Sequence, residues 1–452
     1  MAILRVSLGV RLVESLKEPL AFLSKQAQRS SPLPLVLMLA LVGSPLLAHS
    51  QQQQNGSAVQ PSFMDLIDHW PSPWATIPFY GLRLWDTHTF WAEINPAQGV
   101  YDWSDVDMWL GVHKQKHVDL LFTLGMTPAW AVRFINPGCH DGVGECDPPD
   151  DVNADGSGTD QHWQDFVTAI AKHVGTEVNY WEIWNEPNNP PYWSGTYAQL
   201  ARMAQDARSI ILSVNPNAKL LNPGTSSHYS AGLNWWNGYA AAGGLQWADI
   251  IAVHGDVRPS VVACGDYPEP ETFLTVMQNL HTVLMQYGQD NKPIWDTEAS
   301  WGRTDGDCFT DQDLQAAFLG RFYLLHLSLG VQRFYWRGWI DGNGGLYNPQ
   351  TGLNKAGVAY EQVHKWLIGS TMTQACATQG SSTTWTCAFT RPDGYEAVAV
   401  WDTSQSCKGS VCTTIPYQVG SPYVDYLTLD GSKIRITNGT VPIGAKPIWV
   451  EN

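Results

Sequence analysis

The sequence predicts an α/β protein, a (β/α)8 TIM barrel followed by a small C-terminal all-β domain. Between residues 61 and 369, short β-rich runs alternate with helical stretches, which is typical of parallel strands joined by helices. After residue 369 the chain contains turn signals but no helix-length segment. With 452 residues, 44% of them hydrophobic, the chain can form more than one domain and bury a large core.

Eight candidate strands follow one another in the barrel region. They cover residues 62–67, 80–86, 118–124, 178–184, 218–222, 250–254, 292–297 and 331–336. Apolar residues recur at helical spacing between them, most clearly over 161–173, 197–214, 271–287 and 311–329. This pattern fits one barrel with insertions. A doubly wound open sheet is the alternative, but no Gly-rich phosphate loop follows an early strand.

The C-terminal region has a different pattern. Alternating or β-branched runs cover residues 385–390, 396–402, 423–429 and 433–437, and turn signals such as Pro392-Asp393-Gly394 separate them. We therefore expect the barrel to span residues 61–369 and a β-sandwich-like accessory domain to span residues 370–452.

The first fifty residues resemble a targeting segment. Basic side chains outnumber acidic ones there, and an apolar run follows over 33–47, which is the order of a secretory signal peptide. A retained N-terminal anchor or a misassigned start is the alternative. Residues 51–60 begin with glutamines and small polar residues, which predicts a linker. We expect a secreted or periplasmic protein.

The eight cysteines occur as four neighbouring pairs. The pairs are Cys139 with Cys146, Cys264 with Cys308, Cys376 with Cys387, and Cys407 with Cys412. Disulfides are the natural interpretation behind a signal peptide, and neighbours are the favoured partners, although sequence alone does not fix the connectivity.

Charge excludes several classes of partner. The chain has 26 Lys+Arg and 42 Asp+Glu, a net charge of −16, which becomes −19 without residues 1–50 because that segment carries +3. Such a chain repels nucleic acids and anionic membrane surfaces. The 22 Trp residues are the most unusual part of the composition, and indole rings stack on apolar surfaces.

Two carboxylates lie where barrel enzymes place their active sites. Glu186 follows the fourth predicted strand, and Glu298 follows the seventh. Acidic groups in such apolar surroundings are costly to bury unless they are paired or act as acids and bases. Glu182 and Asp296 lie earlier on the same strands and are expected to be polar residues of the core.

The motifs around these carboxylates resemble the retaining glycoside hydrolases of clan A. Residues 184–187 read Trp-Asn-Glu-Pro, and residues 297–299 read Thr-Glu-Ala. Segments 82–86, 96–104, 123–131 and 334–336 are similar to family 39 and its β-xylosidase-like relatives. The resemblance implies a glycosidase with Glu186 as acid/base and Glu298 as nucleophile. A retaining mechanism needs these carboxyl groups about 5–5.5 Å apart.

The resemblance also implies substrate-binding residues. Asn185 would hold a sugar hydroxyl, and His254 would be a site histidine rather than a core one. The aromatic expected two residues later is Asp256, so either Asp256 binds hydroxyls or Tyr229 takes the place of the aromatic. Arg83 would keep Glu298 ionised, with an ion pair to Glu182 or Asp296 as the alternative.

Further pocket residues are expected at the strand ends. Indole faces pack against the C–H faces of sugars, which makes four tryptophans candidate platforms. They are Trp85, Trp130, Trp301 and Trp336. His69 and Asp86 could line the pocket or cap strand ends. Core packing is the alternative for any single Trp.

No cofactor is expected, because the histidines have no metal-binding spacing such as HExxH. Asp151, Asn153 and Asp155 resemble the first half of a Ca²⁺ loop, but the twelfth position is His162, so a solvated turn is favoured. The expected partner is a neutral carbohydrate, and no nucleic acid or membrane contact is expected beyond an N-terminal anchor. A catalytically inactive carbohydrate-binding barrel, or an inverting or transglycosylating enzyme, remains the alternative.

Overall fold

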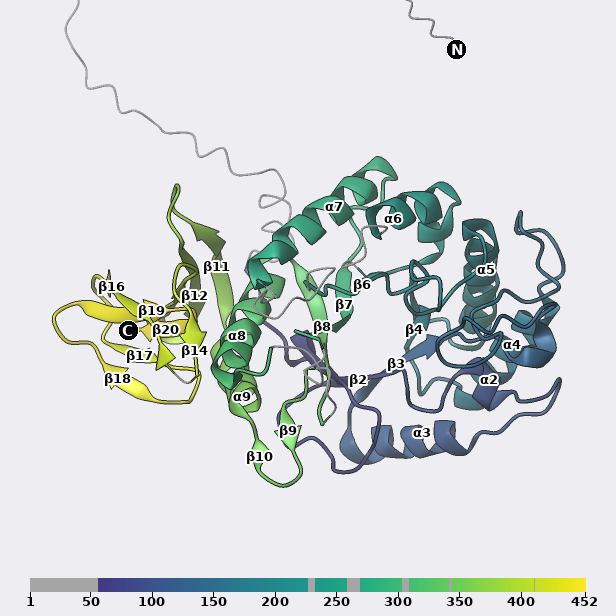
Figure 1. Cartoon of the computed structure of the whole chain (residues 1–452), viewed down its shortest axis with the longest axis horizontal. Helices are drawn as coiled ribbons and strands as arrows, with labels where there is room; N and C mark the ends of the chain where they lie inside the picture. The colour runs from purple at the N-terminus through teal and green to yellow at the C-terminus, as the bar shows by residue number, and fades with distance from the viewer. Residues whose placement is uncertain (1–55, 227–231, 258–268, 303–308, 341–343, 410) are drawn as a thin grey trace, which may run out of the picture. The chain divides into compact units, whose positions relative to one another are not determined.

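The computed structural model describes residues 56–226, 232–257, 269–302, 309–340, 344–409 and 411–452. Eight parallel strands form one sheet in the order β5-β4-β3-β2-β1-β8-β7-β6 (Figure 1). They are β1 Met64–Ile67, β2 Gly81–Leu84, β3 Asp119–Leu124, β4 Tyr180–Ile183, β5 Lys219–Leu221, β6 Ile251–Val253, β7 Ile294–Ala299 and β8 Val331–Arg337. Parallel bridges join Leu221 to Ile250 and Ser226 to His254, so the two ends of the sheet meet. The predicted TIM barrel is confirmed, and every predicted strand overlaps an observed one.

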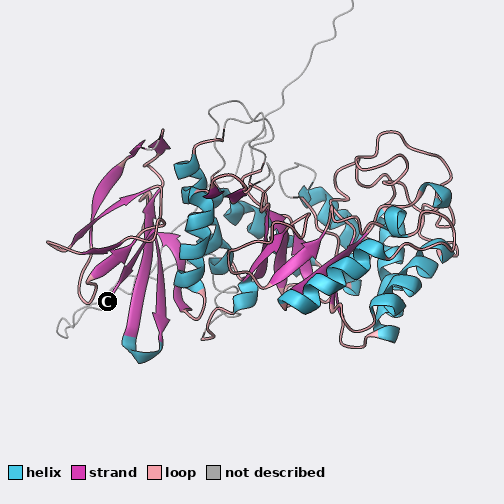
Figure 2. Ribbon diagram, turned by 90° about the horizontal axis from the view of Figure 1, so that it is seen from below, coloured by secondary structure: helices cyan, strands magenta, loops and turns pink. Residues whose placement is uncertain are grey.

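Helices flank the barrel strands (Figure 2). They are α2 Trp91–Ile94, α3 Ser104–Lys116, α4 Gln161–Val174, α5 Tyr197–Val214, α6 Gly232–Ala241, α7 Phe273–Gln286, α8 Gln312–Ser328 and α9 Lys355–Leu367. The four predicted helical stretches coincide with α4, α5, α7 and α8. Side chains fix the start of two of them: Thr196 and Gln199 form a capping box on α5, and Asp311 caps α8. No helix in the described ranges is both long and apolar enough to cross a membrane.

Side chains along each barrel strand alternate between two apolar clusters. Outward-facing residues such as Leu82 and Trp181 belong to the large cluster shared with the helices. Inward-facing residues such as Leu121 and Tyr335 form a smaller cluster inside the barrel. This period of two determines which residues can enter a site at the barrel axis.

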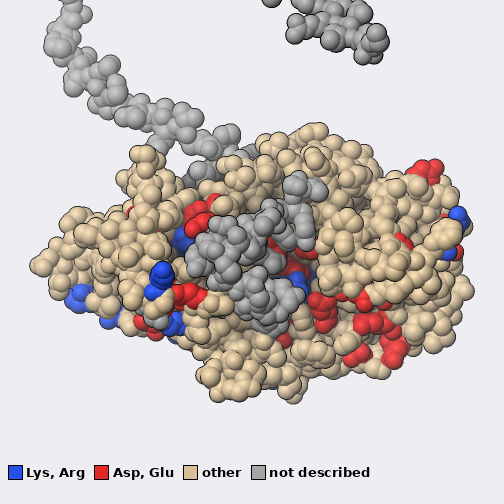
Figure 3. Space-filling view, in the orientation of Figure 1, with Lys and Arg blue, Asp and Glu red and all other residues tan. Residues whose placement is uncertain are grey.

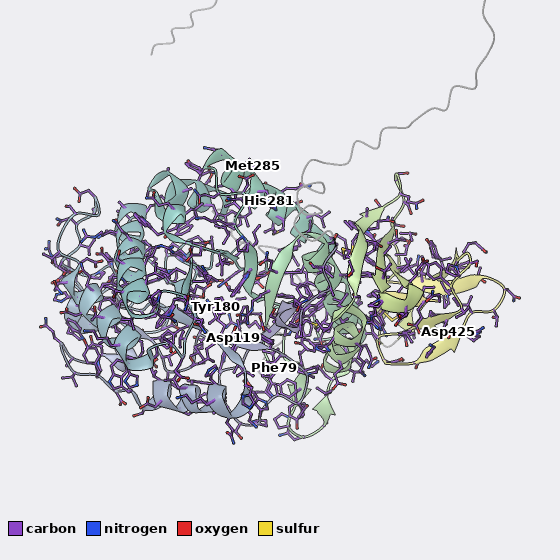
Figure 4. The ribbon with its side chains drawn as sticks, turned by 180° about the vertical axis from the view of Figure 1, so that it is seen from behind. Phe79, Asp119, Tyr180, His281, Met285 and Asp425 are labelled. Carbon is purple, nitrogen blue, oxygen red and sulfur yellow. A yellow bond between two sulfur atoms is a disulfide. The ribbon has the colours of Figure 1, made fainter. Side chains whose placement is uncertain are left out.

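Arg333 on β8 closes the N-terminal end of the barrel interior. Its Nε lies 2.7 Å from Asp65 Oδ2, and its Nη1 lies 2.8 Å from Asp119 Oδ2. Its guanidinium lies 4.6 Å from the ring centroid of Trp295 and 5.2 Å from that of Tyr180. Asp119 and Tyr180 are close together in Figure 4. The charge is therefore paired and stacked, and this end of the barrel serves stability.

A β-bulge interrupts β7 just before its carboxyl end. Asp296 pairs with Phe334 and Ala299 pairs with Trp336, so three steps on β7 match two steps on β8. The extra residue breaks the alternation and lets Thr297 and Glu298 both face the barrel interior. Bulges of this kind are common beside active sites.

The C-terminal strands form separate sheets, which are drawn in yellow-green to yellow in Figure 1. A six-stranded sheet has the order β11-β12-β13-β20-β17-β18, and β14-β15 and β16-β19 are two-stranded. The strands are β11 Thr371–Thr378, β12 Thr384–Arg391, β13 Tyr395–Asp402, β14 Cys407–Lys408, β15 Val411–Cys412, β16 Thr414–Gln418, β17 Asp425–Leu427, β18 Lys433–Arg435, β19 Thr440–Gly444 and β20 Ile448–Glu451. Apolar residues including Val400, Ile443 and Val450 form a core of their own.

Polar contacts join these sheets to the helices of the barrel. The backbone N–H of Cys376 donates to Ser328 Oγ on α8 at 2.8 Å, and Trp401 Nε1 donates to Glu271 Oε1 at 2.8 Å. Asp313 on α8 pairs with Lys446 just before β20. We propose, from these contacts, that residues 370–452 act as a structural accessory to the barrel.

Three of the four predicted disulfides are present. They join Cys139 to Cys146, Cys376 to Cys387 and Cys407 to Cys412. The predicted pair Cys264 with Cys308, the targeting segment over 1–50 and the start of the linker lie outside the described residues.

Candidate active site

Glu186 and Glu298 lie together at the carboxyl ends of β4 and β7. One oxygen of each carboxylate and one ring nitrogen of His254 lie within 4.8 Å of one another. Both glutamates are buried, with 8% of Glu186 and 2% of Glu298 exposed. The two strand ends therefore bring two buried carboxyl groups close to each other.

Arginines surround the carboxylate of Glu298. Arg83 Nη1 donates to Oε2 at 2.8 Å, and Arg337 Nη1 donates to Oε1. Burial alone would raise the pKa of Glu298, but the positive charges of Arg337, His254 and Arg83 outweigh it and hold that pKa far below its usual range. The surroundings of Glu298 therefore favour its ionised form.

Arg83 connects three side chains beneath the site. Besides Glu298, it donates from Nε to Glu182 Oε2 and from Nη2 to Asn185 Oδ1, both at 2.7 Å. Thr297 Oγ1 donates to the other oxygen of Glu182 at 2.6 Å. Arg83 therefore contacts Glu298 and also forms the ion pair with Glu182 that was the alternative.

Asp296 is not a partner of Arg83. Its Oδ2 lies 2.7 Å from Nε2 of His326 on α8, and its carboxylate also accepts from the backbone N–H of Gly255. The His326 ring stacks between Phe273 and Phe334, at centroid distances of 4.0 Å from each. Asp296 is therefore a polar residue of the core, as the sequence predicts.

His254 contacts Glu186 directly, with 3.1 Å between Nδ1 and Oε1. Burial lowers the pKa of His254, but the charge of Glu298 and the hydrogen bond with Glu186 raise it, and the net shift is upward. The structure therefore brings His254, which the sequence analysis places in the site, into contact with Glu186.

The backbone at Glu186 is strained. Glu186 has φ 43° and Trp184 has φ 73°, in the left-handed region that non-glycine residues rarely adopt. The N–H of Glu186 donates to the carbonyl of Gly224 at 2.7 Å, which fixes this conformation. Because the chain turns sharply here, the Glu186 side chain lies above Glu182 beside Glu298.

Asp86 and His69 form one edge of the site. Asp86 Oδ2 lies 3.6 Å from Arg337 Nη2 and 3.7 Å from His69 Nε2. Asp256 is buried and accepts from the backbone N–H of Ser300 at 3.2 Å. Tyr229, the other candidate for the missing aromatic position, lies outside the described residues.

Two predicted tryptophan platforms face away from the site. Trp336 is 0% exposed and Trp301 is 2% exposed. Trp336 stacks on Tyr323 of α8 and packs against Trp301 at 5.0 Å. The prediction is wrong for Trp336 because even positions of β8 face α8, whereas Tyr335 and Arg337 face the barrel interior. It is wrong for Trp301 because that ring packs against Phe309 and Phe318 as well as Trp336.

The other two predicted tryptophans differ from each other. Trp85 is buried beside Arg83, 5.7 Å from its guanidinium, and packs against Tyr192 at 6.5 Å, so it supports the site. Trp130 is half-buried and contacts Trp91 and His162 instead. Those contacts place Trp130 over α2 and α4, so it is not brought to the carboxylate pair.

Sequence reasoning missed Arg337 and Tyr192. Arg337 follows Arg333 and Tyr335 at a spacing of two, so the alternation of β8 would identify it once the inward face is known. Burial raises the pKa of Tyr192, and the charges of Glu186, Asp141 and Glu298 raise it further, which places Tyr192 between the carboxylate pair and the loop carrying Asp141.

That loop follows β3 and is closed by the disulfide between Cys139 and Cys146. The ring of His140 lies 4.9 Å from that of Tyr192, and the N–H of His140 donates to the carbonyl of Pro191 at 2.9 Å. Figure 3 shows a group of acidic side chains to the right of the centre of this face. The loop therefore forms one wall beside the site.

The remaining metal hypothesis concerns Asp151 and Asp155. Asp151 Oδ2 accepts from the backbone N–H groups of Gln161 and His162 and so caps α4. Asp155 Oδ1 accepts from Ser157 N and Oγ. Both carboxylates therefore have protein partners of the kind expected in a hydrogen-bonded turn.

Comparison with known proteins defines the class of fold. No protein-family model matches the sequence, and no curated protein sequence matches it. Solved structures do match, and they show that the chain has the barrel fold of clan A glycoside hydrolases with an added β domain.

Family 39 enzymes and β-xylosidases are among these structures. A family 39 glycoside hydrolase from Bacteroides cellulosilyticus matches with TM-score 0.63 and 19% identity over 86% of this chain and 81% of that one. A family 39 enzyme from Xanthomonas axonopodis matches with TM-score 0.60 and 17% identity over 87% of this chain and 95% of that one. A monomeric β-xylosidase from Caulobacter crescentus matches with TM-score 0.57 and 16% identity over 82% of this chain and 89% of that one.

Proposed function

We propose that this chain is a secreted retaining glycoside hydrolase that cleaves β-O-glycosidic bonds in neutral oligo- or polysaccharides. The observation that carries the proposal is the pair of buried carboxyl groups, Glu186 and Glu298, within 4.8 Å of each other at the carboxyl end of the barrel. The similarity to family 39 structures and the three disulfides support it.

The two carboxyl groups have unequal surroundings, as double displacement requires. Glu298, held as an anion by two arginines, attacks the anomeric carbon, while Glu186 gives its proton to the leaving oxygen. The carbon–oxygen electron pair leaves with that oxygen, and a glycosyl ester of Glu298 remains. Glu186 then takes a proton from water, the water oxygen attacks the same carbon, and Glu298 is released.

Asn185 and His254 support these steps. Arg83 donates to Asn185 Oδ1, so the amide is oriented with Nδ2 available on its other side to donate to a sugar hydroxyl. The 3.1 Å contact of His254 fixes the position of the Glu186 carboxyl group. We propose that Asp86, His69 and Asp256 bind hydroxyls around the same sugar.

The proposal is tested with 2,4-dinitrophenyl and 4-nitrophenyl β-glycosides of xylose, glucose and arabinose. The wild type should release the β-anomer first, as followed by proton NMR. Glu298→Ala should lose turnover, and added azide should trap an α-glycosyl azide. Glu186→Ala should reduce turnover by about 10²–10⁴-fold on substrates with poor leaving groups. With added azide it should give a β-glycosyl azide. Asp249→Asn, which affects an ion pair with Arg208 outside the site, is the control.

Three results would contradict the proposal. Initial release of the α-anomer would mean an inverting enzyme, and unchanged turnover by Glu298→Ala would remove the proposed nucleophile. A wild type that binds oligosaccharides but hydrolyses none of the panel would favour the non-catalytic carbohydrate-binding protein.

A further inference from the structure

The two oxygens of Glu298 are held by arginines that differ in burial. Arg83, on Oε2, is 0% exposed and also bonds to Glu182 and Asn185 at 2.7 Å. Arg337, on Oε1, has a side chain that is 25% exposed and comes from the end of β8. Arg83 therefore belongs to the buried frame of the site, whereas Arg337 reaches Glu298 from its partly exposed edge.

Nucleophilic attack uses one oxygen of Glu298. Each carboxylate oxygen has two lone pairs, and the attacking oxygen must direct one of them at the anomeric carbon. Oε2 is bonded to the buried Arg83, so we assign the attack to Oε1, the oxygen that Arg337 holds.

Asp86 offers Arg337 a second carboxylate at the edge of the site. Its Oδ2 lies 3.6 Å from Arg337 Nη2, and its side chain is 31% exposed. Asp86 is held by a backbone with φ 55° directly after β2, so its position is set by the barrel and not by Arg337. A small rotation of Arg337 would exchange one carboxylate partner for the other.

We propose that Arg337 is a positioning residue, which holds Oε1 of Glu298 in the free enzyme and moves onto Asp86 when a sugar enters. The inference rests on the proposed glycosidase function. In the first chemical step Oε1 bonds to the anomeric carbon, the leaving oxygen takes the bond's electron pair and the proton of Glu186, and the positive charge of Arg337 stays within the site on Asp86.

Charged or titratable groups surround Glu298 from four strands or strand ends and from one loop. They are Arg83 and Asp86 from β2, Glu182 and Glu186 from β4, His254 from β6, Arg337 from β8 and, in the loop after β4, the phenol of Tyr192. Removing Arg337 alone leaves Arg83 and His254 as cations. Because an adjacent cation lowers a carboxyl pKa by about 1–3 units, the loss should be measurable.

The experiment compares Arg337→Gln, Arg337→Lys and Asp86→Asn with the wild type. The acid limb of kcat/KM should move to higher pH by about 1–3 units in Arg337→Gln and remain near the wild-type position in Arg337→Lys. Asp86→Asn should not move the acid limb to higher pH. It should lower kcat by about fivefold, which is the scale of one partly exposed ion pair. Arg208→Gln removes a comparable arginine, paired with Asp249 at 2.7 Å, and should match the wild type.

A titration of ¹³C-labelled glutamate carboxyl groups makes the test independent of turnover. The Glu298 signal is assigned by its loss in Glu298→Gln, and its pKa should rise in Arg337→Gln. An unchanged pKa of Glu298 in Arg337→Gln would contradict the proposal that Arg337 holds Glu298. A wild-type kcat in Asp86→Asn would contradict the proposed movement of Arg337 onto Asp86. A wild type that hydrolyses no glycoside would instead reject the proposed function, while the titration would still decide whether Arg337 holds Glu298.

Discussion

Asp296 and Glu298 lie two residues apart on β7 yet point in different directions. Asp296 Oδ2 lies 2.7 Å from His326 on α8, outside the barrel, and Glu298 Oε2 accepts from Arg83 at 2.8 Å inside it. A regular strand would place both on one face, because side chains repeat every two residues. The bulge between Asp296 and Ala299 separates them, so one carboxylate stabilises the core and the other enters the site.

This separation predicts different consequences for two isosteric substitutions. Asp296→Asn weakens buried hydrogen bonds to His326 and Gly255, so the free energy of unfolding should fall by about 1–3 kcal/mol while the folded enzyme keeps its turnover. Glu298→Gln should remove turnover. Urea unfolding and kinetics on the same samples measure both quantities, and loss of turnover by fully folded Asp296→Asn would contradict the assignment.

Arg83 should be essential for the stability of the fold as well as for the ionisation of Glu298. Arg83→Met leaves the buried carboxylates of Glu182 and Glu298 without their shared cation, and breaking such a pair lowers the free energy of unfolding by about 3–5 kcal/mol. Arg208→Met, at a partly exposed pair with Asp249, should lower it by about 0–1 kcal/mol. Chemical denaturation measures both, and equal losses would show that burial is not the decisive factor.

Asp160 should make stability fall as the pH rises. Its side chain is 0% exposed, and burial together with the contact and charge of Asp206 and the charge of Asp151 raises its pKa to about 9. The unfolded value is about 3.9, so the folded state binds an additional proton between these values and its stability is lost progressively as pH rises from about 4 to about 9. The slope from this group approaches about 1.4 kcal/mol per pH unit.

Asp160→Asn should remove this slope. Asparagine tolerates the φ of 52° at this position and does not titrate. Between pH 5 and pH 9, the melting temperature should therefore fall less for the variant than for the wild type. Parallel pH profiles of the two proteins would show that Asp160 is ionised in the folded state.

The disulfide between Cys139 and Cys146 should stabilise the wall beside the site more than the whole protein. It closes a loop with a sequence separation of 7, for which chain entropy gives about 2–3 kcal/mol. The double variant Cys139→Ser/Cys146→Ser should raise KM more than it lowers kcat, because His140 loses its fixed position against Tyr192. The double variant Cys407→Ser/Cys412→Ser in the β domain is the matched control and should leave KM unchanged.

Sequence reasoning worked best where the signal is local. Hydrophobic periodicity located the eight barrel strands and four of the helices, and Glu186 and Glu298 were identified from their positions at strand ends. It failed for Trp336 and missed Arg337, neighbours on β8 that face opposite sides. Proximity to a strand end does not specify the face, and an error of one residue exchanges the core face for the site face.

The sequence by itself determined the order of the elements, the class of fold and the two carboxylates at the strand ends, because these follow from patterns within a few residues. The tertiary structure decided which partners those carboxylates have. Arg83 and Glu298 are 215 residues apart in the chain, and Arg337 meets Glu298 from the neighbouring strand. Their contacts depend on barrel closure and on the bulge in β7, which no local periodicity reveals.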